Sequence, residues 1–168
     1  MVKRPHDAVV PKEVMKDARL RQAVKSDYLL VLGQAAYCFA LCEWQVVWCC
    51  EKIRPGSLHK IVGEELTAGK IAKRFLDVTR NMPPSAGREK LKASAERFAT
   101  LVKMRNWILH GKPCTGPNGE SRLSSSKVLE ISHLEDGADA FSQCSIELNE
   151  QFYGFLASYQ PGLAGAAE

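Results

Sequence analysis

The hydrophobic positions of the chain recur every three or four residues over long stretches, which is the spacing of an amphipathic helix. The pattern predicts helices over residues 26–53, from 67 to before 83, from about 85 to 111, and from about 134 to 159. Ser26 is a suitable N-cap, and Gly111 is a suitable residue to follow a helix end. A further short helix is expected to begin at Glu13.

The pattern changes between the last two long helices. Residues 114–132 contain the turn signal Pro117-Asn118-Gly119 and then a short apolar run, which predicts a loop with a small β-hairpin. Long helices with short connections predict an all-α fold, an antiparallel bundle of four to five helices with this hairpin or loop before the last one. We expect a flexible arm at 1–12, one helical domain at 13–160 and a flexible tail at 161–168.

Composition and charge add a hint about partners. The chain has 168 residues, of which 45% are hydrophobic and 25% charged, as in an ordinary globular domain. Residues 1–112 carry 21 Lys and Arg against 11 Asp and Glu, whereas residues 113–168 carry 2 against 8. A basic body suits a polyanion such as RNA. The alternative is that these charges only solvate helix faces.

The run from Tyr28 to Cys50 is nearly apolar and long enough to cross a membrane. Gln34, Glu43 and Gln45 interrupt it, which favours instead a central helix buried on most sides. No secretory signal precedes it. The six cysteines lack zinc-ligand spacing and are expected to be reduced thiols. We therefore expect a cytoplasmic protein with no membrane segment and no metal.

Arg105 is an unusual residue on the predicted third long helix. It interrupts a row of apolar side chains formed by Leu91, Ala95, Phe98, Val102 and Leu109. A guanidinium in such a row needs a partner or a cleft, because an unpaired buried charge is costly. Glu43 and Glu51 on the first long helix each follow an apolar stripe and are the expected partners. A purely structural Arg–Glu bridge is the alternative interpretation.

His110 is expected to end the same helix, since Gly111 follows and Pro113 prevents continuation. A helix C-terminus favours a protonated imidazole, which is useful for proton transfer but also suits a simple capping role. Asn106 shares a face with His110, whereas Arg105 lies about 140° away on an ideal helix. Either Arg105 reaches round the helix, or a two-fold dimer brings two such helix ends together.

The segment Arg105-Asn106-x-x-x-His110-Gly111 resembles the Arg-polar-x(4–6)-His signature of the HEPN (higher eukaryotes and prokaryotes nucleotide-binding) superfamily. Its place at the end of a long helix also matches. The segment TAGKIAKRF and the glutamate-bearing first helix are similar to the abortive-infection and toxin-like branches of that superfamily. The resemblance covers about residues 25–160.

The resemblance implies a helical homodimer and a metal-independent endoribonuclease of the toxin or phage-defence type, without cofactor. His110 would be the general acid or base, Arg105 would hold the phosphate, and Asn106 would orient His110 or the phosphate. Glu43 or Glu51 would support Arg105. The expected RNA-binding residues are Lys70, Lys73, Arg74, Lys103 and Lys112. The alternative function is a non-catalytic module that binds a nucleotide or a protein partner, such as a nucleotidyltransferase or an antitoxin.

Overall fold

A computed structural model of the chain describes residues 22–161. The predicted arm at 1–12, the helix expected from Glu13 and nearly all of the predicted tail therefore lie outside the described residues. The helices are α2 (Ser26–Ile53), α3 (Ser57–Gly63), α4 (Ala68–Arg80), α5 (Ala86–Leu109) and α6 (Ile131–Tyr153), with a short 3-10 turn, η1 (Phe155–Ala157). The predicted all-helical bundle is confirmed.

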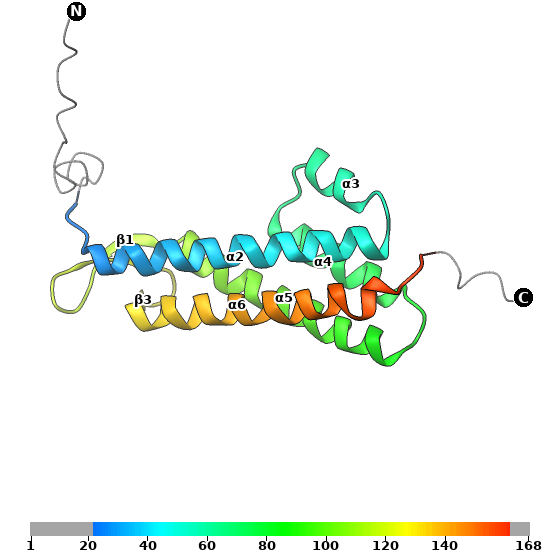
Figure 1. Ribbon diagram of the computed structural model, residues 1–168. Helices are drawn as coiled ribbons and strands as arrows, with labels where there is room; N and C mark the ends of the chain where they lie inside the picture. The colour runs from blue at the N-terminus through cyan, green and yellow to red at the C-terminus, as the bar shows by residue number, and fades with distance from the viewer. Residues whose placement is uncertain (1–21, 162–168) are drawn as a thin grey trace, which may run out of the picture.

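The three longest helices form the body of the bundle (Figure 1). α2 and α6 run side by side in the same direction, and α5 runs in the opposite direction against both. Their inner faces meet in a core of aromatic rings, in which Phe39 of α2 lies 5.9 Å from Phe98 of α5 and 5.2 Å from Phe141 of α6 between ring centroids. The core therefore joins all three helices at the level of Phe39.

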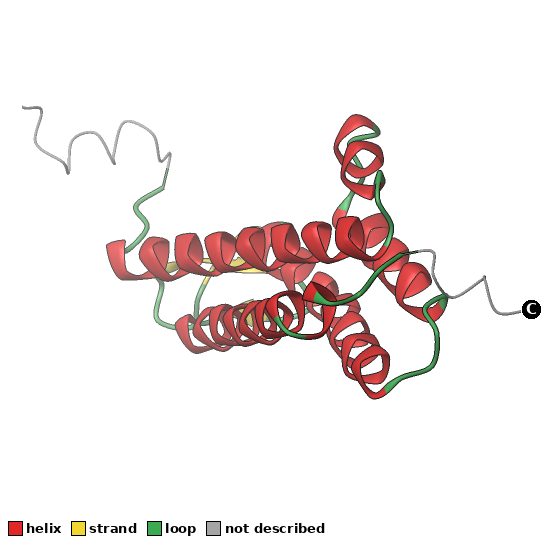
Figure 2. Ribbon diagram, turned by 45° about the vertical axis from the view of Figure 1, so that its right-hand side comes forward, coloured by secondary structure: helices red, strands yellow, loops and turns green. Residues whose placement is uncertain are grey.

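A small antiparallel sheet closes one end of the bundle, beside the start of α2 and of α6 (Figure 2). Its strands are β1 (Lys112–Thr115), β2 (Ser121–Ser124) and β3 (Val128–Leu129), in the order β1-β2-β3. The sequence predicts two of these strands as a hairpin, and the third is added by the residues just before α6. Gly111 allows the sheet to come close to α5, because a Cβ there would lie 2.9 Å from the Cβ of Leu123.

Two elements differ from the prediction. The last helix ends at Tyr153 and gives way at Gly154 to η1, rather than continuing to residue 159. The short helix α3 is not predicted, because seven residues are too few to show a helical period. Both differences concern short segments whose conformation depends on contacts with other elements.

α2 carries large apolar side chains on its outer face as well as on its inner face. The outer stripe of α2, as we name it, consists of the exposed residues Leu30, Tyr37, Leu41, Trp44 and Trp48. Among the described helices, only α2 is long and apolar enough to cross a bilayer, judged by length and composition. Of its most apolar stretch of 18 residues, 28% is buried. The expectation that this helix is buried on most sides is wrong, because the outer stripe is exposed, although α3 borders it at Trp44 and Phe152 and Tyr159 border it at Trp48.

Candidate functional site

The end of α5 carries the three side chains of the sequence motif. α5 extends to Leu109 and His110 is its C-cap, donating its backbone N–H to the carbonyl of Asn106 at 3.0 Å. β1 begins two residues later at Lys112. The helix thus ends where the sequence places its end, and the motif lies at the junction between the bundle and the sheet.

Arg105, Asn106 and His110 are in contact with one another within one chain. Nη1 of Arg105 donates to Oδ1 of Asn106 at 2.9 Å and lies 3.5 Å from Nε2 of His110. The long arginine side chain therefore reaches round the last turn of α5, and convergence of the motif does not require a second chain. If the longer contact is a hydrogen bond, Nε2 is its acceptor and Nδ1 carries the imidazole proton.

The ring of Phe39 packs against the guanidinium of Arg105 on the side of the core. The Cζ atom of Arg105 lies 5.5 Å from the centroid of the Phe39 ring, which is itself only 3% exposed. A cation over an aromatic face at this distance is attracted by the ring quadrupole. Nε of Arg105 is buried without a hydrogen-bond partner, which confines the useful donors of this guanidinium to its outer end. Asn106 and His110 are exposed, so the outer end faces solvent.

Glu43 lies near Arg105 but does not form a bridge to it. Burial raises the pKa of Glu43, and the positive charge of Arg105 acts in the opposite direction. The ion pairs of the described residues do not include one within 4.0 Å between Arg105 and a carboxylate. The alternative interpretation of Arg105 as half of a structural Arg–Glu bridge is therefore wrong, and the influence of Glu43 is that of a nearby charge.

The prediction that Glu51 supports Arg105 is wrong. Glu51 lies twelve residues beyond Phe39 on α2, a distance of about 18 Å along the helix axis. Its carboxylate accepts the backbone N–H groups of Gly56 at 3.0 Å and Leu58 at 2.7 Å, and these bonds lower its pKa. Gly56 has a φ of 86°, which favours glycine. Glu51 thus holds the tight turn into α3.

The predicted RNA-binding residues fall into two groups. Lys103 and Lys112 are exposed on either side of His110 in sequence. Lys70, Lys73 and Arg74 line a pocket of about 360 Å³ with Arg54, Glu64 and Asp77. Arg74 is close enough to Cys50 to influence the pKa of that thiol, and Cys50 lies about 16 Å along α2 from Phe39. The second group is therefore well separated from the motif.

Sequence reasoning missed a second polar cluster beside the end of α5. Nζ of Lys127 lies 5.2 Å from the centroid of the Trp107 ring and 3.0 Å from Nε2 of His133. Nδ1 of His133 accepts the backbone N–H of Glu130 at 3.1 Å, an arrangement that caps α6. Trp107 and Arg105 point to nearly opposite sides of α5 on an ideal helix. No spacing signal connects these residues, because three different elements supply them.

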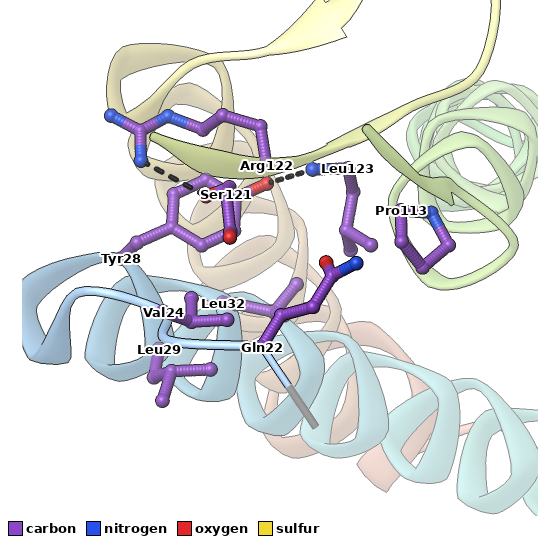
Figure 3. A pocket seen from close by; sticks show the side chains of 9 residues that line it. All are labelled: Gln22, Val24, Tyr28, Leu29, Leu32, Pro113, Ser121, Arg122 and Leu123. Carbon is purple, nitrogen blue, oxygen red and sulfur yellow. Dashed lines mark hydrogen bonds between the residues drawn. The ribbon is translucent and has the colours of Figure 1, made fainter. Parts of the chain in front are cut away.

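Arg122 and Tyr28 fasten the sheet to α2 (Figure 3). The guanidinium of Arg122 lies 4.7 Å from the centroid of the Tyr28 ring, and the Tyr28 hydroxyl accepts the backbone N–H of Leu123 at 3.1 Å. Arg122 also pairs with Glu120 at 3.4 Å and Glu130 at 3.5 Å. Apolar side chains beside this cluster line a pocket of about 410 Å³. The sequence-predicted site residues do not line that pocket.

The chain was compared with known proteins at the levels of sequence family, individual sequence and fold. A scan against protein-family models, a search of curated proteins and a search of solved structures each returned no match.

Proposed function

We propose that this chain is a metal-independent endoribonuclease of the HEPN type, acting in the cytoplasm as a homodimer in a toxin or phage-defence role. The observation that carries the proposal is the contact of Nη1 of Arg105 with both Asn106 and His110. A cation and an imidazole at one exposed point form a minimal site for cleaving a phosphodiester without a metal.

In the proposed reaction the ribose 2′-OH attacks the adjacent phosphorus and the bond to the 5′-oxygen of the next nucleotide breaks. The products are a 2′,3′-cyclic phosphate and a 5′-OH. His110 either removes the proton of the 2′-OH as general base or donates a proton to the departing 5′-oxygen as general acid. Arg105 binds the phosphate and offsets the negative charge of the transition state, for which its planar fork is suited. Asn106 holds Arg105 in position through its Oδ1.

The two groups of basic residues would guide the RNA backbone. Lys103 and Lys112 lie close to the motif in sequence, and Lys70, Lys73 and Arg74 lie at the distant pocket. Contacts of lysine and arginine with phosphates weaken as salt rises, because bound counterions are released on binding. We expect binding of mixed-sequence RNA to decrease steeply with salt.

The test is incubation of the purified chain with mixed RNA in EDTA, followed by analysis of the new termini. We expect the wild type to produce 2′,3′-cyclic phosphate ends. The cleavage rate of His110→Ala should be lower by about 100-fold or more, which is the usual effect of losing a general acid or base. His59→Ala is the matched control, because His59 is exposed on α3 away from the motif. Equal cleavage by the wild type and His110→Ala would remove His110 from the mechanism.

The second candidate function is a non-catalytic interaction module that binds a nucleotidyltransferase or an antitoxin. The exposed outer stripe of α2 favours it, since a contiguous exposed apolar patch usually marks an interaction site. Absence of cleavage by the wild type, together with stable capture of a defined protein partner, would support this second candidate over the first.

A further inference from the structure

A polar pocket lies beside α4, well separated from the motif. Charged side chains from three segments of the chain line it, and these are Arg54, Glu64, Lys70, Lys73, Arg74 and Asp77. Three of the four cations belong to α4, whereas Arg54 follows the end of α2. Four cations against two carboxylates give the lining a net charge of +2. The pocket therefore favours an anion, and a dianion would balance its charge.

Neighbouring side chains do not pair with the cations of this pocket. The ion pairs within 4.0 Å among residues 22–161 include no member of the pocket. In the same part of the chain, the side-chain nitrogens of Arg54, Lys70 and Lys73 have no hydrogen-bond partner. The two carboxylates thus reduce the positive charge of the pocket without pairing with any one cation.

The sequence of α4 places like charges next to one another. Lys70 is three residues before Lys73 and four before Arg74, so the three cations are neighbours on one face. Like charges at these spacings destabilise a helix. Lys70 also lies in the first turn of α4, which has no acidic residue and where the helix dipole disfavours a cation. An anion bound at this face would relieve both effects.

A buried hydroxyl group holds Arg74 in the pocket. Ser57, at the start of α3, is fully buried, and its Oγ donates to the carbonyl of Arg54 at 2.7 Å. The same Oγ accepts Nη2 of Arg74 at 3.4 Å, which connects α4 to the turn that carries Arg54. Among the described residues Nη1 of Arg74 has no hydrogen-bond partner. This nitrogen is therefore available to a ligand.

The pocket has room for more than an inorganic anion. Its volume of about 360 Å³ lies in the range of pockets that bind small organic molecules. Leu66 and Val78 provide apolar walls, and Asn81 provides an amide that can both donate and accept hydrogen bonds. An organic group fits against these residues while its anionic end meets the cations.

We propose that this pocket binds a phosphate monoester. The phosphate contacts Lys70, Lys73 and Arg74, and the organic group lies against the apolar walls. A monoester carries a charge of about −1.5 to −2 at neutral pH, which matches the pocket, whereas each diester of an RNA backbone carries only one. Arginine binds phosphate through its planar fork and lysine binds it as a point charge.

This inference goes beyond the proposed function, which gives the basic residues of α4 only a general attraction to the RNA backbone. A terminal phosphate has two possible carriers, a small phosphorylated molecule and the 5′ end of an RNA. Both present the same dianion, and the experiments below distinguish them.

NMR titration of the full chain with phenyl phosphate tests the pocket. Methyl phenyl phosphate is the matched control ligand, because it keeps the ring but is a diester with a single charge. We expect saturable shifts of the α4 amides with a dissociation constant of about 1 mM or lower, and binding of the diester weaker by about 10-fold or more. Equal binding of the two compounds, or no shift on α4, would overturn the proposal.

Two substitutions assign the binding to named residues. Lys70→Gln and Lys73→Gln should each weaken the binding of phenyl phosphate by about 5-fold or more, since each removes one charge that meets the phosphate. Both lysines are exposed, so circular dichroism should show an intact fold. Lys25→Gln is the matched control, because the 28 residues of α2 separate this exposed lysine from Arg54. Unchanged affinity in both pocket variants would overturn the proposal.

Competition by short RNAs identifies the carrier. His110→Ala serves as the protein so that cleavage does not interfere, and two RNAs of one sequence carry either a 5′-phosphate or a 5′-hydroxyl. Displacement of phenyl phosphate by the 5′-phosphorylated RNA alone would assign the pocket to an RNA end. Displacement by neither would assign it to a small phosphorylated molecule. Equal displacement by both would show that backbone diesters occupy the pocket and would overturn the proposal.

The outcome for this pocket is independent of the outcome for the motif. His110→Ala should bind phenyl phosphate as the wild type does, because the pocket is well separated from His110. Failure of RNA cleavage therefore leaves this inference in place, and failure of phosphate binding leaves the assignment of His110 in place.

Discussion

At the scale of single residues, Arg105 gains its position from contacts on both sides. Phe39 supports its guanidinium from the core side, and Asn106 and His110 meet its outer end. Its Nε is buried without a hydrogen-bond partner, which lowers the stability of the fold. An apolar side chain at this position would pack without that loss of stability. In the guanidinium of Arg105, Nη1 contacts Asn106 and His110, which leaves the second terminal nitrogen for a phosphate. A lysine has only one nitrogen and could not do both.

Glu43 provides a pH-dependent test of this environment. Burial raises its pKa above the ordinary value of 4.5, so its ionised form destabilises the fold. The stability that the protonated form provides is present below the ordinary pKa and is lost as the pH rises through the folded pKa. We therefore expect Glu43→Gln to be more stable than the wild type at about pH 7, with a smaller difference at about pH 4.

Urea unfolding at the two pH values measures this effect. Glu96→Gln controls for the loss of one negative charge, because Glu96 is exposed on α5. If Glu43→Gln were instead less stable than the wild type at neutral pH, attraction to Arg105 would outweigh the cost of burying Glu43.

At the scale of elements, short segments depend on single side chains from their longer neighbours. α3 has seven residues, too few for a stable isolated helix. The carboxylate of Glu51 accepts two of its N-terminal amides and thereby fixes the turn after α2. α6 is capped in a similar way by Glu130 and His133, which lie at its own first turn. The polar side chains at helix ends thus set the path of the chain between the long helices.

We expect Glu51→Ala to lower the free energy of unfolding by about 1 kcal/mol at neutral pH, the typical value of a lost helix cap. The backbone bonds to Gly56 and Leu58 lower the pKa of Glu51 from 4.5. Its contribution is therefore present above the ordinary pKa and is lost as the pH falls through the folded pKa. Chemical denaturation over this pH range measures it.

Glu150→Ala is the control for the Glu51 prediction, because Glu150 is an exposed carboxylate on α6. Hydrogen exchange adds a local readout: the Leu58 amide should exchange faster in Glu51→Ala. An unchanged Leu58 amide would show that α3 does not depend on this carboxylate.

At the scale of the whole molecule, the sheet keeps the end of α5 attached to the start of α2. The backbone N–H of Leu123 on β2 donates to the hydroxyl of Tyr28, which lies 95 positions away in sequence. Tyr28 is 1% exposed and the guanidinium of Arg122 covers its ring. Because β1 begins two residues after His110 and pairs with β2, this contact also restrains the chain that leaves the candidate site.

Tyr28→Phe should destabilise the chain by about 1 kcal/mol, because the partly buried amide of Leu123 loses its acceptor. Exchange of the Leu123 amide should become faster, which hydrogen exchange measured by NMR detects. Tyr37→Phe, which removes an exposed hydroxyl from the same helix, should leave both quantities unchanged. Unaltered Leu123 exchange in Tyr28→Phe would mean that the strands of the sheet, and not Tyr28, protect this amide.

The sequence by itself determined the existence of the four longer helices and the place of the motif, but not α3 or the end of α6. α2 begins at Ser26 and ends at Ile53 as predicted, and α5 ends where Gly111 and Pro113 prevent its continuation. These features are local, since helical period, caps and breakers act within a few residues. The positions of Arg105, Asn106 and His110 follow from the same local signals.

Only the tertiary structure decided which charges and faces meet. It separates Glu51 from Arg105, brings Arg105 to His110 across an ideal angle of about 140°, and joins Tyr28 to Leu123. It also decided that one apolar face of α2 is packed and the other exposed. Spacing along a helix shows which residues share a face, but the partner of that face comes from distant parts of the chain, or from another chain.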